Sequence, residues 1–262
     1  MNTVATLGSL HARMLRNKIY SLNDFAAAID SFKPDIILTE VRPAFPGPIE
    51  GSIDGGIEQS LVYAIAEESG AEVRPVDWFD DELISRMERE GRELNPHQVS
   101  QIELLQKKYV ETIETGSIFQ LNSQQVQNQV RELYAMYESF HLSASKSRNE
   151  KICLNIQKEL RTIRGKRVLI IFGLDHKFYI EDCVSEDDQA KISSMSEWFN
   201  MDQRNAFTMN TAIKNRTVEN MKAAEKLLRI RVRSNFYSND LKPRLAKKLE
   251  SFGDWIEVIS GL

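Results

Sequence analysis

The sequence predicts an α/β fold in which a mainly parallel central sheet is flanked by helices and carries an α-helical insertion. Three short runs of apolar or β-branched residues, at 4–10, 36–38 and 168–172, have the length and composition of buried strands. Helical patterns alternate with these runs, and such alternation is typical of parallel sheets. With 262 residues and a mass of 30.1 kDa, the chain can bury the core of one such domain.

Residues 1–77 are predicted to form the first part of the α/β core. The first strand is followed by Ser21, and an acidic residue three positions later makes Ser21 a helix N-cap; Pro34 ends that helix. A second helix leads to a third strand candidate at 72–77. Pro75 cannot donate a backbone hydrogen bond, so this strand is expected at an edge of the sheet.

Residues 78–145 are predicted to form the helical insertion, because apolar residues recur there at three- and four-residue spacing without a strand signal. An antiparallel helical hairpin or small bundle over one edge of the sheet fits this pattern. Residues 146–262 complete the core, and the three segments form one domain. The elements expected in this last segment, besides the strand at 168–172, are helices from about Arg148 and at 186–198, 215–228 and 241–252, and a final strand at 255–259.

The composition predicts neither a nucleic acid nor a membrane as a partner. The formal net charge of −4 and the pI of about 5.7 give no basic footprint. No stretch approaches the ~18 apolar residues of a membrane span, and no signal peptide is expected before the first strand. Cys153 and Cys183 lack the spacing of metal ligands, so we expect reduced thiols, with Cys183 a free structural thiol, and a cytoplasmic location.

Two tetrapeptides of the form Gly-x-x-His stand where predicted strands end. One comprises residues 8–11 and the other residues 173–176. Open α/β sheets bind their ligands at the carboxyl ends of the strands, so both imidazoles are expected at that edge. The pocket residues predicted on this ground are Gly8, His11, Gly173, Asp175 and His176.

Polar residues also follow the other two predicted strands, with Glu40 and Arg42 after the second and Asp77 after the third. The carboxyl ends of parallel strands share one edge, so His11, Glu40 and His176 are predicted to converge. Two imidazoles and a carboxylate suit a divalent transition metal of the Mn, Co or Zn class. The same groups without a metal would form an acid–base pair near neutral pH.

Each of these residues also has an ordinary structural interpretation. A single histidine at a strand end more often satisfies backbone groups than binds a metal, and Glu40 with Arg42 would form a common surface ion pair. Glu58 in the first turn of a helix suits the helix dipole. Asp77 would cap a helix, and Arg148 would be a solvated charge. Convergence in space is what would favour a functional site.

Taken together, these residues resemble the superfamily that joins TraB/PrgY pheromone-shutdown proteins, Tiki metalloproteases, GumN, erythromycin esterase and ChaN. The matching positions follow the family's order over nearly the whole chain: Gly-x-x-His at 8–11, a strand ending in Glu-x-Arg at 34–42, Gly-x-Glu at 56–58, Val-Asp at 76–77, Arg-Asn at 148–149 and Gly-x-x-His at 173–176. The resemblance implies an α/β core with a helical insertion and a hydrolase-like pocket. The Tiki branch implies metal-dependent peptide cleavage, and the esterase branch implies that a histidine and a glutamate activate water on a lactone.

The leading prediction is a cytoplasmic, metal-assisted hydrolase that cleaves a peptide or ester bond in a small-molecule or peptide substrate. His11 and His176 would hold the ion, with Glu40 as a further ligand or the general base. Arg42 and Arg148 would stabilise an oxyanion or clamp a substrate carboxylate. Glu58 would orient one of the ligands.

Two alternatives remain open. One is a non-catalytic ligand-binding or regulatory module that keeps the pocket and contacts a protein partner through the helices of residues 81–142, although a solvated helix surface explains the same pattern. The other is a metal-free esterase in which His11 and Glu40 activate water.

Overall fold

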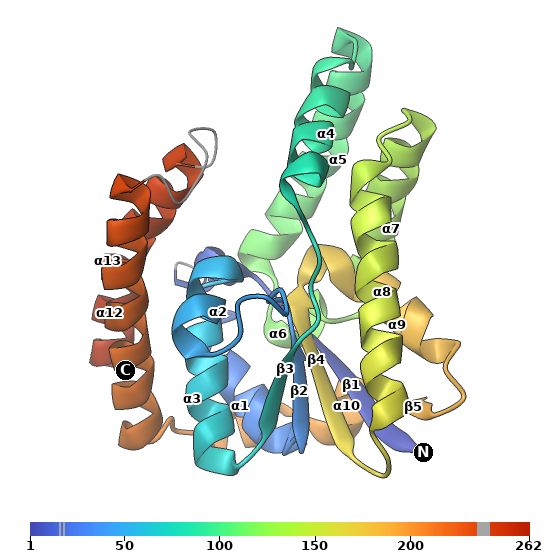
Figure 1. Ribbon diagram of the computed structural model, residues 1–262. Coiled ribbons are helices and arrows are strands. Elements are labelled where there is room, and N and C mark those ends of the chain that lie inside the picture. The colour runs from blue at the N-terminus through green and yellow to red at the C-terminus, as the bar shows by residue number, and fades with distance from the viewer. Residues whose placement is uncertain (16, 18, 235–241) are drawn as a thin grey trace.

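The structure is a computed structural model that describes residues 1–15, 17, 19–234 and 242–262. In this part of the chain the centre is a five-stranded sheet with the strand order β3-β2-β4-β1-β5, and every strand pair is parallel (Figure 1). The predicted α/β fold is therefore confirmed. The strands are β1 (Asn2–Ser9), β2 (Ile36–Thr39), β3 (Glu72–Pro75), β4 (Arg167–Gly173) and β5 (Ala190–Ile192).

The register of the sheet brings the two Gly-x-x-His motifs together. β1 pairs with β4 over its whole length, so that Gly8 lies opposite Phe172 and Ser9 lies opposite Gly173. The two motifs therefore begin one position apart on adjacent strands. β3 lies at the edge of the sheet, as Pro75 predicts.

Helices cover both faces of the sheet. Alternate residues of a strand point to opposite faces, and the buried core accordingly falls into two clusters. On one face Leu7 and Ile171 pack with α1 and α3, and on the other Val4 and Ile170 pack with α8 and α9. The helices of the core are η1 (a 3-10 turn, His11–Leu15), α1 (Leu22–Phe32), α2 (Pro48–Asp54), α3 (Gln59–Ser69), α8 (Ala144–Thr162), α9 (Leu174–Ser185), α10 (Met195–Trp198), α11 (Met201–Ala206), α12 (Thr211–Arg233) and α13 (Lys242–Gly261).

Local signals explain where α1 begins and ends. Ser21 and Asp24 form a capping box, in which each side chain accepts a hydrogen bond from the other residue's backbone N–H. At the other end Lys33 adopts the left-handed conformation, and Pro34 follows. These are the residues at which the sequence predicts the two ends of the helix.

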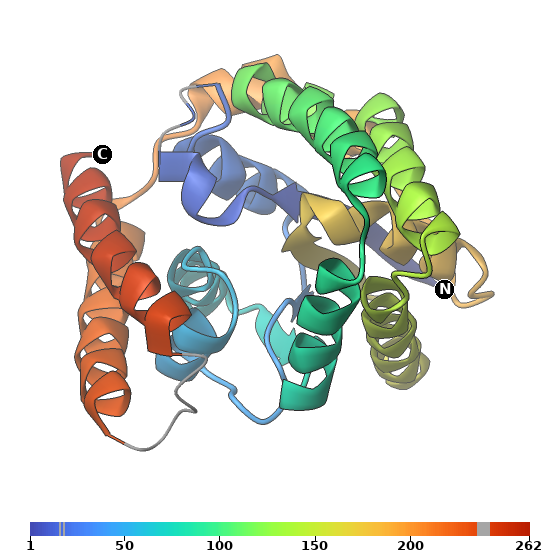
Figure 2. The same ribbon diagram turned by 90° about the horizontal axis from the view of Figure 1, so that it is seen from above.

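A layer of four helices stands between β3 and α8 in sequence. It comprises α4 (Asp81–Arg92), α5 (Pro96–Thr115), α6 (Ile118–Leu121) and α7 (Gln124–Ser139). In Figure 1 the chain climbs from the end of β3 into α4 and α5, which stand above the sheet. Seen from above, α4, α5 and α7 on one side and α12 with α13 on the other surround the region over the strand ends (Figure 2). None of the helices described is long and apolar enough to cross a membrane.

The final strand predicted at 255–259 is wrong, because these residues belong to α13. Phe252, Trp255 and Ile259 are all fully buried, and their spacing of three and four residues is that of one helix face. The two apolar pairs within 255–259, which predict a strand, are too short a pattern to outweigh this longer one. The helix predicted at 241–252 is otherwise present, although Leu241 lies outside the described residues.

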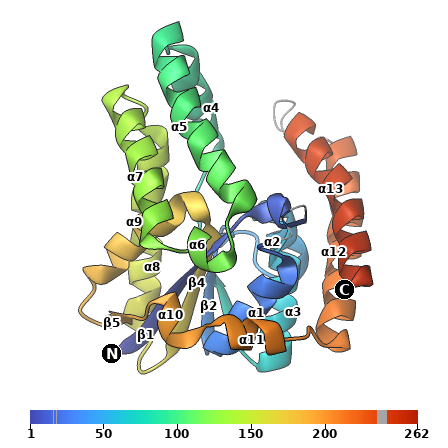
Figure 3. The ribbon, with the colours of Figure 1, turned by 180° about the vertical axis from the view of Figure 1, so that it is seen from behind.

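The prediction of a helix at 186–198 is also wrong for most of that range. A helix, α9, occupies the residues before it, and the chain then forms β5 and the short α10. β5 pairs in parallel with the first residues of β1. Figure 3 shows α10 and α11 running along the end of the sheet opposite to α4 and α5. A strand of three residues carries too little periodicity to be recognised from sequence.

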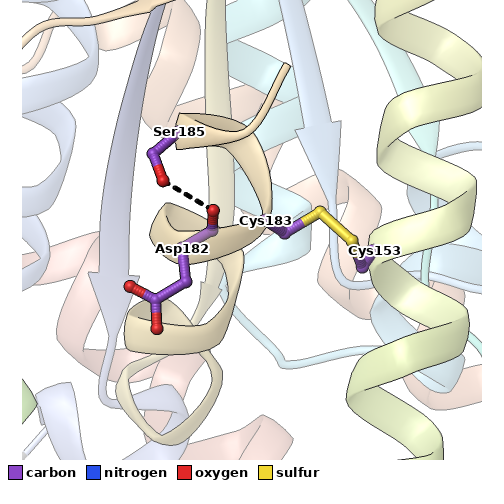
Figure 4. The surroundings of a disulfide bond; sticks show 4 residues. All are labelled: Cys153, Asp182, Cys183 and Ser185. Atoms are coloured by element: carbon purple, nitrogen blue, oxygen red, sulfur yellow. Dashed lines mark hydrogen bonds between the residues drawn. A yellow bond between two sulfur atoms is a disulfide. The ribbon is translucent and has the colours of Figure 1, made fainter.

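Cys153 on α8 and Cys183 on α9 are joined by a disulfide, with their Cα atoms 5.9 Å apart (Figure 4). The prediction of reduced thiols, with Cys183 free, is therefore wrong. The bond joins cysteines 30 residues apart, and their approach becomes evident only once α9 is placed against α8. Disulfides persist mainly in oxidising environments, so the cytoplasmic location loses this support and stays a prediction.

Removal of the disulfide is expected to lower the free energy of unfolding by about 3–4 kcal/mol, because the bond closes a loop of roughly 30 residues in the unfolded chain. Urea denaturation of the variant Cys153→Ala/Cys183→Ala measures this loss. A reductant should destabilise the wild type and leave the double variant unchanged. Equal midpoints for the two proteins without reductant would contradict the bond.

Candidate functional site

The carboxyl ends of β1, β2 and β4 converge on one group of charged side chains. His11 follows β1, Glu40 follows β2 and His176 lies in the first turn of α9 after β4, while Arg148 reaches the group from α8. All four line a cavity of about 640 Å³. A second cavity, of about 430 Å³, shares His11, Glu40 and Arg148 and adds Asp77. The structure thus brings together residues that lie far apart in sequence.

His11 is held from one side by a buried carboxylate. Its backbone φ of 49° is in the left-handed region, which residues other than glycine rarely adopt. Nδ1 donates a hydrogen bond of 2.7 Å to Glu58 Oε1, and Ser9 Oγ donates one of 2.9 Å to the same oxygen. Glu58 is fully buried, whereas 41% of the His11 side chain is exposed. The ring is therefore oriented by Glu58 while remaining accessible from the cavity.

This environment raises the pKa of His11 to about 9. Burial alone would lower the value, but the negative charges of Glu58 and Glu40 and the hydrogen bond to Glu58 outweigh it. The same pairing holds the pKa of Glu58 below its ordinary value despite burial. His11 is consequently an imidazolium at neutral pH, with an N–H on both ring nitrogens.

Glu40 is the carboxylate that the other groups share. Its Oε2 accepts a hydrogen bond of 2.6 Å from the backbone N–H of Gly173 and lies 3.6 Å from His11 Nε2. Its Oε1 accepts one of 2.9 Å from Arg148 Nη2. Only 9% of the side chain is exposed, and each oxygen keeps a lone pair beyond these bonds. Glu40 is thus fixed in position without losing its capacity to accept a proton.

Arg148 joins Glu40 to Asp77. Its Nη2 donates to Asp77 Oδ2 at 2.8 Å, and its Nε donates to Asp77 Oδ1 at 3.2 Å. Burial raises the pKa of Asp77, while the adjacent guanidinium opposes that rise. The two carboxylates raise the pKa of Arg148 even though burial alone would lower it. One buried cation therefore compensates two buried carboxylates.

His176 is neutral, whereas His11 is positively charged. Burial lowers its pKa to about 3, and the positive charge of Arg148 adds to the effect. Nε2 lies 3.1 Å from Arg148 Nη1, and Nδ1 lies 2.6 Å from Asn149 Oδ1. A guanidinium can only donate, so Nε2 accepts and Nδ1 carries the proton. His176 is therefore a neutral imidazole in one tautomer.

The two glycines of the motifs make this close approach possible. A Cβ atom on Gly173 would lie 2.5 Å from His11 Nε2, closer than such atoms approach one another. A Cβ atom on Gly8 would lie 2.2 Å from Leu174 Cδ2. Each motif therefore leaves room for a side chain of the other.

Two predicted pocket residues lie at the margin of the group. Asp175 lines the larger cavity, where its Oδ1 accepts a hydrogen bond of 2.6 Å from Tyr109 of α5. Arg42 is not brought together with His11: its Nη2 donates to Asp54 Oδ1 at 2.5 Å, and its guanidinium lies 3.9 Å from the Phe79 ring centroid. Arg42 lines a neighbouring cavity of about 430 Å³ instead.

Sequence reasoning gives no role to several residues of the site. Asn149 is part of the Arg-Asn match at 148–149, but its contact with His176 depends on how α8 packs against α9. Asp54 is distinguished only by the two glycines after it. Tyr109 and Lys248 carry no local signal, because each reaches the site from a helix far from the strand ends in sequence.

The donors predicted for a divalent ion are already paired within the protein. His176 Nε2 accepts from Arg148, and both oxygens of Glu40 accept N–H groups. Within the described ranges, no group of three or more His, Cys, Asp and Glu side chains has an arrangement that could hold a metal ion. An ion at the predicted position would compete with the Arg148 guanidinium, so the residues do not fit a metal in this arrangement. The divalent ion stays a prediction.

Comparison of the chain with protein-family models, curated proteins and solved structures found no match. The superfamily resemblance accordingly stays a prediction, and the chemistry of the site rests on its geometry.

Replacement of Glu58 by glutamine is expected to lower the pKa of His11 from about 9 toward its usual value of 6.5, because the nearest negative charge is removed. An NMR titration of the His11 ring measures the change, with Glu114→Gln on the exposed face of α5 as the control. A raised pKa stabilises the folded state below pH 6.5, and this contribution is lost as the pH rises through 9. The wild type should therefore lose more stability over this window than Glu58→Gln, and identical titrations would contradict the pairing.

Gly173→Ala is expected to displace the His11 ring, because the new methyl group would lie only 2.5 Å from Nε2. The His11 resonances and pKa should change while the fold persists. The matched control is Gly91→Ala, since a Cβ there meets nothing within 4 Å and alanine favours the helix. An unaltered His11 titration in Gly173→Ala would show that the ring is not confined in this way.

Proposed function

We propose that this protein is a hydrolase that cleaves an ester or amide bond by acid–base catalysis without a metal. The observation that carries the proposal is the position of protonated His11 Nε2 at 3.6 Å from Glu40 Oε2, on the wall of a cavity. A protonated imidazole beside a glutamate can serve as the acid and the base of a catalytic pair.

Glu40 is the base in this proposal. Its Oε2 takes a proton from water while the water oxygen adds to the carbonyl carbon of the substrate. His11 is the acid, and its Nε2–H donates a proton to the leaving oxygen or nitrogen as the bond to the carbonyl carbon breaks. The proton on Glu40 then passes to His11, which restores both groups. Acid–base catalysis of this kind contributes about 10²–10⁴-fold to a rate.

The remaining charged groups maintain these protonation states. Glu58 raises the pKa of His11 and so keeps this acid protonated at neutral pH. Arg148 Nη2 binds Glu40 Oε1 at 2.9 Å and holds the carboxylate in place. His176, neutral and hydrogen-bonded on both nitrogens, supports Arg148 without adding charge. Together these interactions keep His11 protonated and hold Glu40 in position.

The charges of these groups favour this mechanism over the metal-assisted alternative. A metal ligand must offer a free lone pair, and the imidazolium of His11 offers none until it loses a proton. Within this arrangement His176 and Glu40 are engaged by Arg148. The metal-free alternative requires no rearrangement of these contacts.

Glu40→Gln is expected to reduce kcat/KM for p-nitrophenyl acetate by about 10²–10⁴-fold, because glutamine keeps the bond to Gly173 but cannot accept the proton. Glu114→Gln should retain wild-type activity. The activity of the wild type should decrease at alkaline pH as His11 deprotonates near pH 9. Dialysis against EDTA should leave the activity unchanged.

Other outcomes would overturn the proposal in distinct ways. A loss on EDTA that Zn²⁺, Mn²⁺ or Co²⁺ restores would establish the metal-assisted mechanism. Full activity of Glu40→Gln would remove the assigned base. Absence of turnover by the wild type on ester and amide panels, with binding retained, would establish the non-catalytic module.

A further inference from the structure

The neighbouring cavity of about 430 Å³ that Arg42 lines adjoins the His11–Glu40 site and differs from it in character. Its walls come from α2, α4 and α13, and Arg148 borders both spaces. Most of the exposed lining is apolar, with Ile53, Phe79, Leu83, Ile84 and Leu245 among the contributors, and charged side chains of both signs line the rest. A volume of this size and polarity suits one large apolar group of a small molecule.

Lys248 on α13 lies at the junction of the two spaces and lines both of them. Its Nζ donates hydrogen bonds of 2.6 Å and 2.5 Å to the carbonyl oxygens of Ile53 and Gly55. An ammonium group has three N–H donors, so these two bonds leave one donor over. In the described part of the chain no carboxylate oxygen forms an ion pair with this Nζ.

The three arginines around the junction form ion pairs with carboxylates. Arg42 binds Asp54, Arg148 binds Glu40 and Asp77, and Arg231 binds Glu50. Lys248 instead donates to two neutral backbone carbonyls, and Lys247 beside it is exposed. Burial lowers the pKa of Lys248 to about 8, against the opposing effect of Glu58, Asp54 and Glu40, so that the ammonium form predominates at neutral pH.

We propose that the substrate is an N-acyl amino acid with a large apolar side chain, its carboxylate bound by Lys248 and its side chain in the apolar cavity. This inference rests on the proposed hydrolase function and names its substrate class. In such a compound the carboxylate and the side chain are bonded to the same carbon atom, and that carbon is bonded to the nitrogen of the scissile amide. The arrangement matches a cation at the junction, an apolar cavity on one side of it and the His11–Glu40 pair on the other.

Charge favours a carboxylate at this position. Lys248 gains a charge-assisted hydrogen bond from the ligand without giving up an existing ion pair. A carboxylate beside Arg42 or Arg148 would instead displace Asp54, Glu40 or Asp77. The hydrolysis consumes water and yields a free amino acid and a carboxylic acid, through the proton transfers of Glu40 and His11 described above.

Isothermal titration of the slow variant Glu40→Gln with three probes tests the inference. N-acetyl-L-phenylalanine should bind at least about 10-fold more tightly than N-acetyl-L-phenylalaninamide, which lacks the charge, and than N-acetylglycine, which lacks the side chain. Addition of Lys248→Met should abolish the preference for the acid over the amide. Addition of Ile84→Trp should fill the cavity and weaken the phenylalanine probe while leaving N-acetylglycine unaffected. The matched control is Lys222→Met, an exposed lysine of α12.

Activity on p-nitrophenyl acetate, which has neither group, separates this inference from the hydrolase function. Turnover of that ester together with equal binding of the acid and the amide would overturn the substrate class and leave the hydrolase. Preferential binding of the acid that survives Lys248→Met would also overturn it, because another cation would then hold the carboxylate. Preferential binding lost in Lys248→Met, without turnover of any probe, would leave the ligand class and overturn the hydrolase.

Discussion

The site depends on the contact of Arg148 with Glu40 and Asp77. Two carboxylates buried near one another destabilise a fold unless a cation lies between them, and here that cation comes from α8, which packs on the face of the sheet opposite to α1 and α3. The guanidinium also supplies a donor to His176. Because one planar group satisfies all three partners, the positions of β2, β3, α8 and α9 relative to one another are coupled through it.

The two Gly-x-x-His motifs show that tetrapeptides of the same pattern acquire different electrostatic character from their neighbours. His11 faces Glu58 and Glu40 and holds a proton, whereas His176 faces Arg148 and Asn149 and stays neutral. The difference arises from which helix end lies beside each strand end. The difference in protonation between the two histidines therefore results from the topology of the sheet more than from the motif itself.

Strand ends, and therefore most of the site, were predictable because short apolar runs followed by polar residues are local signals. The approach of His11, Glu40 and His176 follows from parallel strands sharing an edge. By contrast, the charge states of the histidines depend on Glu58, Arg148 and Asn149 at distances that only packing determines.

The end of α13 was predicted wrongly because two apolar pairs within 255–259 imitate a strand, while the burial of Phe252, Trp255 and Ile259 depends on tertiary contacts. The disulfide could not be predicted for the same reason, because the approach of its two cysteines depends on how α9 packs against α8.

The sheet order has a consequence for how the chain folds during synthesis. β1 is the first strand to be made, and its two neighbours, β4 and β5, lie at Arg167–Gly173 and Ala190–Ile192. At about 5–20 residues per second, a ribosome needs on the order of ten seconds or more to deliver them. Through that interval an apolar strand has no native partner on either side, and such non-local pairing slows folding. Among the strands of this sheet, β1 therefore waits longest for its native partners.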